Sequence, residues 1–143
     1  MPNASRGSAQ CALVQNQWVK LWQNMDYYMD AAYVYHRIGA HVEMSPRNTA
    51  NVTILIQESE TGLAGTWTRV WRSDPIVPGG HSDFAWNHNL AFVRILCYST
   101  GVGVVDATRV MPELQSLPSD DRTALSCASF CEQDCETTGE TTG

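Results

Sequence analysis

Long hydrophobic runs are missing from this sequence. Its uninterrupted apolar stretches are only a few residues long, whereas a helix that crosses a bilayer needs about 20 apolar residues. Residues 1–8 are small and polar, and no apolar segment of the kind found in secretory signals follows Arg6. We therefore expect a soluble chain with no membrane partner and no secretory signal.

Basic side chains are scarce. The sequence has 9 Lys and Arg against 15 Asp and Glu, which gives a formal net charge of -6. Residues 1–112 hold equal numbers of basic and acidic side chains, so the whole negative excess falls in residues 113–143. A neutral body beside an acidic tail offers no basic stripe that could neutralise phosphates. The charge pattern therefore predicts no nucleic-acid partner.

Motifs of the common catalytic and nucleotide-binding sites are also absent. The sequence contains no H-E-x-x-H, G-x-S-x-G, P-loop or G-x-G-x-x-G after a strand. The segments 81–83 and 87–89 fall in predicted loops that could converge, but ordinary loop polarity is the favoured interpretation. We predict no catalytic residue, no metal site and no cofactor, and therefore no enzyme. The histidines considered for such sites are His36, His41, His81 and His88.

Strand periodicity is what the sequence does contain. Residues 51–58 place Val52, Ile54 and Ile56 on one face, as expected of a half-buried strand. Residues 65–72 are rich in β-branched and aromatic side chains, and Asp74-Pro75 ends that run. These patterns predict two strands.

Three further segments have strand character. Residues 90–98 and the β-branched run 102–110 flank a turn, which predicts a hairpin in the middle of a sheet. Residues 31–44 fit one long strand or two strands joined at Gly39. Residues 11–28 fit either an amphipathic helix or a strand, and we favour the strand.

Together these segments predict an all-β fold. With 143 residues and 43% hydrophobic content, the chain is long enough for one domain with its own core. We expect a single antiparallel β-sandwich, jelly-roll-like, in residues 11–112. A flexible arm (residues 1–10) precedes it, and an acidic, cysteine-containing tail (residues 113–143) that is irregular or short-helical follows it.

The order of motifs in the body resembles a known group. Gln57-Glu58-Ser59 ends one strand, residues 65–70 (Gly-Thr-Trp-Thr-Arg-Val) follow a turn, and a Pro-Gly-Gly loop precedes Phe92-Val93-Arg94-Ile95. Over residues 31–111 this is similar to small β-sandwich accessory structural proteins of tailed bacteriophage virions, of the head decoration and head fibre type.

The resemblance implies a virion structural protein. We expect a homo-oligomer that binds capsid or tail proteins of the same particle and is assembled in the host cytoplasm. The alternative is a carbohydrate-binding β-sandwich that uses surface tryptophans. Trp67 and Trp71 lie four apart on a predicted strand and would point the same way, with Trp86 on a neighbouring run. These aromatics could form a sugar-binding platform or an interface between subunits, although core packing is the favoured interpretation for all three.

The cysteines of the tail have an unusual spacing. Cys127, Cys131 and Cys135 form C-x3-C-x3-C, which on a helix would place the thiols along one face. Zinc would need a fourth ligand such as Cys11 or Asp134, and free thiols are a further alternative. We favour disulfides, with one cysteine reaching Cys11 or a neighbouring subunit. Cys97, in an apolar strand, is expected to be a buried small side chain.

Overall fold

All the regular secondary structure in the described part of the chain is β-strand. The structure is a computed structural model, and it describes residues 7–24, 35–87, 92–114 and 131–133. No helix in these segments has the length and apolarity to cross a membrane. In chain order the strands are β1 (Gly7–Ala12), β2 (Trp18–Asn24), β3 (Tyr35–Met44), β4 (Val52–Ser59), β5 (Thr68–Arg72), β6 (His81–Asn87), β7 (Phe92–Ser99), β8 (Val104–Leu114) and β9 (Cys131–Gln133).

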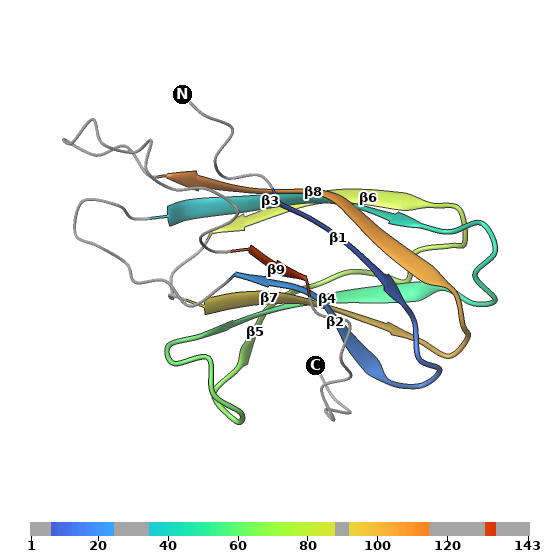
Figure 1. The fold of residues 1–143 in the computed structure, drawn as a ribbon, viewed down its shortest axis with the longest axis horizontal. Coiled ribbons are helices and arrows are strands. Elements are labelled where there is room, and N and C mark those ends of the chain that lie inside the picture. Colours follow the sequence, from blue (N-terminus) through green and yellow to red (C-terminus); the bar gives the residue numbers. More distant parts are fainter. Residues whose placement is uncertain (1–6, 25–34, 88–91, 115–130, 134–143) are drawn as a thin grey trace.

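The strands form two antiparallel sheets that lie face to face (Figure 1). The four-stranded sheet has the order β1-β8-β3-β6, and the five-stranded sheet has the order β5-β4-β7-β2-β9. Strand β1 pairs with β8, β2 with β7, β3 with β6 and β4 with β5. This nested pairing is what results when one long hairpin is rolled up, and it is the connectivity of a jelly roll. The predicted all-β, jelly-roll-like sandwich is confirmed.

The core lies between the two sheets because alternate side chains of each strand point inward. Val42 of β3, Ile54 of β4 and Ile95 of β7 are fully buried in one continuous apolar cluster. The side chains at alternate positions of β4 and β7 are also buried, on the outer face of the five-stranded sheet, where Leu55 and Leu96 form a smaller cluster with Trp18. Strands β4 and β7 are therefore buried on both faces, and the prediction of a half-buried strand in residues 51–58 is wrong.

The predicted hairpin of residues 90–98 and 102–110 is wrong. Strands β7 and β8 exist, but they belong to different sheets, and the segment between them crosses the end of the sandwich. Asn48 and Thr49 hold this crossing, because Asn48 Oδ1 accepts a hydrogen bond from the Val104 N–H and Thr49 Oγ1 accepts one from the Val102 N–H. A local turn pattern cannot predict hydrogen bonds to residues that lie more than 50 positions away in the sequence.

Two predicted boundaries also need correction. Residues 7–10, assigned to a flexible arm, lie in β1 and pair with β8. The tail contributes β9, which pairs with β2 at an edge of the five-stranded sheet, so the tail is not wholly irregular or helical. Strand β3 runs through Gly39 without a break, and the strand assignment within residues 11–28 is confirmed for residues 18–24. Ser119 and Asp120, the expected start of a helix, lie outside the described residues.

Candidate functional site: a polar cluster on the four-stranded sheet

Four charged or titratable side chains meet on the outer face of the four-stranded sheet. His41 and Glu43 are two residues apart on β3, so both point away from the core on either side of the buried Val42. The antiparallel register sets Asp83 of β6 directly opposite His41, and it sets Arg109 of β8 opposite His41 on the other side. The cluster therefore follows from strand alternation together with the pairing of three strands.

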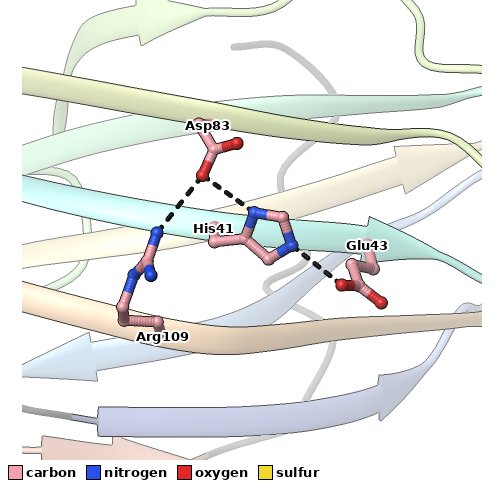
Figure 2. A network of polar contacts seen from close by, with 4 residues as sticks. All are labelled: His41, Glu43, Asp83 and Arg109. Atoms are coloured by element: carbon pink, nitrogen blue, oxygen red, sulfur yellow. Dashed lines mark hydrogen bonds and ion pairs between the residues drawn. The ribbon is translucent and has the colours of Figure 1, made fainter.

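His41 lies at the centre of this cluster (Figure 2). Its Nδ1 atom is 2.8 Å from Asp83 Oδ1, and its Nε2 atom is 2.8 Å from Glu43 Oε2. Arg109 Nη2 reaches the same Asp83 oxygen at 3.4 Å. Both ring nitrogens of His41 therefore face a carboxylate, and Asp83 lies between two cationic groups when the imidazole is protonated.

The cluster is open to solvent at its rim and covered at its centre. The His41 side chain is 19% exposed, whereas the Glu43 and Asp83 side chains are 53% and 57% exposed. The hydrogen bond with Glu43, and next the one with Asp83, raise the pKa of His41 above 6.5. In turn, the hydrogen bond with His41 lowers the pKa of Asp83 below 3.8. Each group therefore favours the charged form of the other.

His81 adds a second imidazole next to the cluster, and imidazoles are common metal ligands. It lies on β6, opposite Glu43, and its ring centroid is 5.4 Å from that of His41. One nitrogen from each histidine and one Asp83 oxygen lie within 4.8 Å of one another. Imidazole nitrogens with a carboxylate oxygen are a common donor set for zinc. The arrangement can hold a proton, a metal ion or a polar ligand.

The sequence interpretation placed part of this cluster in the wrong kind of structure. Residues 81–83 were expected in a loop, but they begin β6. Two sequence patterns could have indicated the cluster. His41-Val42-Glu43 and His81-Ser82-Asp83 each place a histidine and an acid on the same face of a strand. Only the β3–β6 register shows that these two faces are the same one. His36 lies in β3 without a described side chain, and His88 lies outside the described residues.

The tryptophans do not form the shared surface that their spacing predicts. A β-bulge separates Trp67 from Trp71, because the partner of Trp71 is Ile56 while that of Arg69 is the next residue, Gln57. The bulge sends the two rings to opposite faces. Trp71 stacks on Phe84 of the other sheet with the ring centroids 4.8 Å apart, whereas Trp67 lies on the outer face.

Trp86 is a core residue with only 5% of its surface exposed, and its ring lies 6.1 Å from that of Phe84. Core packing, the interpretation favoured from sequence, therefore describes Trp71 and Trp86. Trp67 remains partly exposed, with the guanidinium carbon of Arg94 4.2 Å from its ring centroid. A single platform of Trp67, Trp71 and Trp86 is thus excluded.

The cysteines are only partly described. Cys97 is buried and free, as predicted, and burial raises the pKa of its thiol. Cys11 is buried in β1 and is disulfide-bonded, but its partner is not among the described side chains. Cys131 begins β9, next to β2, and Cys127 and Cys135 lie outside the described residues. Which tail cysteine pairs with Cys11 stays a prediction.

Comparisons with known proteins bear on the fold. Neither a family model nor a curated protein sequence matches the chain. The crystal structure of PirA is similar, with a TM-score of 0.52 and 12% sequence identity over 74% of this chain and 93% of that chain. A mitogen derived from Yersinia pseudotuberculosis has a TM-score of 0.44 and 10% identity over 82% of this chain and 93% of its own. The likeness to PirA shows the fold alone.

Proposed function

We propose that this chain is a non-catalytic binding protein whose binding face is the outer surface of β3, β6 and β8. The observation that carries the proposal is the prearranged network of His41, Glu43, Asp83 and Arg109 on that face (Figure 2). Side chains that already hold one another in place lose less entropy when a partner binds. A cluster held by three strands of a rigid sheet is therefore well suited to recognition.

The charges of this face indicate the chemistry of the partner. Glu43 lies directly opposite Asp106 of β8, and like charges directly opposite each other destabilise a sheet. Among the described side chains of this face, Asp83 adds a third carboxylate, beside the guanidinium of Arg109. A partner surface with basic side chains would relieve this repulsion, because complementary charges promote association and fix its register.

We further propose that the partner is the protein lattice of a virus particle. The jelly-roll connectivity occurs in viral capsid proteins as well as in lectins, and the motifs of residues 31–111 resemble those of accessory virion proteins. The chain would then be a decoration or other accessory protein that binds capsid or tail proteins as a homo-oligomer. Carbohydrate binding has less support, because Trp86 is buried and Trp71 packs on Phe84.

Fractionation of particles from the source culture tests this proposal. Virus particles are separated on a density gradient, and an antibody against the chain is used for immunogold electron microscopy of each fraction. We expect the chain to sediment with intact particles and gold to label their surface. Recovery of the chain only in particle-free fractions, as a monomer, would overturn the proposal.

A charge-reversal variant tests the proposed face. Asp83→Lys is expected to weaken co-sedimentation of added protein with the particles, whereas Asp74→Lys, at an exposed position outside the cluster, serves as the matched control. Equal co-sedimentation of the two variants would show that the chain binds through another surface.

A further inference from the structure

The outer face of the four-stranded sheet also carries the donor atoms of a metal site. We propose that His41, His81 and Asp83 bind a zinc ion, with Glu43 as the hydrogen-bond partner that orients His41. This revises the expectation from sequence that the chain has no metal site. The proposal does not depend on attachment to a particle, because all four side chains belong to one chain.

The distances require only a small adjustment. The three donor atoms lie within 4.8 Å of one another. In a tetrahedral zinc site with bonds of about 2.0–2.1 Å, donor atoms are roughly 3.4 Å apart. His81 and Asp83 are exposed, so rotation of the His81 side chain can bring it closer, while rotation of the Asp83 side chain can widen its 2.8 Å contact with His41. The fourth position would remain open for water or for a donor group of a partner.

The hydrogen bonds of His41 favour a cation next to Asp83. A neutral imidazole has one N–H and one nitrogen lone pair, yet carboxylates face both nitrogens of His41 at 2.8 Å. When His41 is protonated, both ring N–H groups donate to the two carboxylates. When the ring loses the Nδ1 proton and Nε2–H still donates to Glu43, the Nδ1 lone pair points at the Asp83 oxygen, and two acceptors repel each other. A zinc ion that takes the place of the Nδ1 proton and binds both Nδ1 and Asp83 would remove that repulsion, provided the two donor atoms move apart from 2.8 Å to the roughly 3.4 Å of a tetrahedral site.

Glu43 then has the position that supports metal ligands in many proteins. Histidine ligands commonly donate their second N–H to a carboxylate, which fixes the tautomer and makes the ligating nitrogen more basic. Glu43 lies at the nitrogen that does not face Asp83 (Figure 2). Two imidazoles with one carboxylate suit zinc better than calcium or magnesium, which prefer oxygen ligands alone.

A variant of Arg109 distinguishes a zinc site from a cluster that only stabilises the fold. Its guanidinium lies 3.4 Å from Asp83 Oδ1, so its positive charge opposes a cation at the same oxygen. Arg109→Gln should therefore bind zinc more tightly than the wild type. In contrast, His81→Ala and Asp83→Asn should weaken binding by at least the roughly 10- to 100-fold that loss of a ligand's hydrogen-bond partner costs.

Zinc titration of the full-length chain, followed by NMR of its histidine side chains, tests the site directly. Long-range nitrogen–proton spectra are recorded on protein labelled with 15N-histidine, and His41→Gln and His81→Ala assign the signals. We expect saturable shifts at the ring nitrogens of His41 and His81 at one zinc per chain. This readout distinguishes the site from zinc bound by the cysteines of residues 127–135.

Asp74→Asn is the matched control, because Asp74 is an exposed aspartate that does not belong to the cluster. It should leave the zinc affinity unchanged. Shifts spread equally over all four histidines, or zinc uptake that leaves His41 and His81 unshifted, would overturn the proposal. So would an affinity that is the same in His81→Ala, Asp83→Asn and Asp74→Asn. None of these results would affect the proposal of lattice binding, which is tested on particles.

Discussion

The two outer faces of the sandwich differ in how their side chains meet solvent. On the five-stranded sheet, the outward-facing Leu55 and Leu96 have no exposed surface, and Trp18 is only 3% exposed. On the four-stranded sheet, the outward-facing Glu43 and Asp83 are more than half exposed around His41. One outer face thus resembles a second small core, and the other is an open, charged surface.

The surroundings of the outer apolar cluster explain part of its burial. The Tyr98 ring lies 5.1 Å from that of Trp18, and the guanidinium carbon of Arg72 lies 5.9 Å from the same ring. Next to them, Arg94 Nε donates a hydrogen bond to Gln57 Oε1. Amphipathic side chains can cover apolar surface while their polar ends stay hydrogen-bonded. The outer face of the five-stranded sheet therefore adds to stability, whereas the charged outer face of the four-stranded sheet is the surface that we propose for binding.

The largest expected effect comes from truncating the outer apolar cluster. Leu96→Ala removes a fully buried side chain, so we expect it to lower the free energy of unfolding by about 2–5 kcal/mol. Urea denaturation measures this loss, and Leu63→Ala, at a side chain that is 66% exposed, is the control. A loss as small as that of the control would show that the outer cluster does not act as a core.

A smaller effect is expected for Trp67, which contacts Arg94 of β7. Trp67→Ala removes the ring that lies against the Arg94 guanidinium. A cation–π contact contributes roughly 0.5–1 kcal/mol at exposed sites and about 2 when desolvated. We expect a loss within that range in the same denaturation experiment. Trp67→Phe keeps an aromatic face, so it should restore most of the lost free energy of unfolding. If Trp67→Phe is as unstable as Trp67→Ala, the effect comes from packing and not from the cation–π contact.

His41 should contribute to stability in a way that depends on pH. The groups that face it are Glu43 of β3, Asp83 and His81 of β6, and Arg109 of β8. Because the folded-state pKa of His41 is raised above 6.5, its contribution is complete below pH 6.5 and is lost as the pH rises through the folded-state value. Asp83 behaves in the opposite way: its lowered pKa adds stability above pH 3.8 that is lost on acidification.

Denaturation of the metal-free chain at several pH values tests this dependence. His41→Gln should destabilise the protein by no more than about 1 kcal/mol near pH 6, the range of exposed ion pairs. The difference between wild type and variant should shrink as the pH is raised. A difference that stays constant over the whole range would show that His41 acts through packing and not through its charge.

The strands of this fold could be predicted from the sequence far better than their arrangement. The alternation of Val52, Ile54 and Ile56 identified residues 51–58 as a strand, and a run that is apolar on both faces apart from Arg94 identified residues 90–98. The bulges within β2 and β5 leave no such mark. Each bulge shifts the alternation by one residue, so Trp18 lies in the outer cluster although Trp22, four residues later, lies in the main core. Likewise, Trp71 packs on the main core while the Trp67 ring lies against the Arg94 guanidinium.

The polar cluster needed information that no single segment holds. His41 and Glu43 can be placed on one face of β3 from their spacing, but Asp83 and Arg109 join them only through the register of β3 with β6 and β8. The β8 register contains a further irregularity next to His41, where Ala107 pairs with Val42 and Arg109 pairs with His41. Sequence separation and an unseen bulge therefore concealed the site.

The smallest expected effect concerns the end of the tail. Residues 136–143 are polar and contain no side chain suited to a core. Their deletion should leave the melting temperature unchanged within error, which would show that the outer cluster around Leu96 is closed without them. A decrease of several degrees would instead make the end of the chain part of the covering of the five-stranded sheet.

Carboxylate footprinting of the particle-bound chain tests the central claim most directly. Free and bound protein are labelled with a carbodiimide and a small amine, and the modification of each carboxylate is measured by mass spectrometry. If the outer face of β3, β6 and β8 is the binding face, labelling of Glu43, Asp83 and Asp106 falls on binding while that of Asp74 stays the same. Unchanged labelling of the first three, or protection of Asp74 instead, would contradict the account.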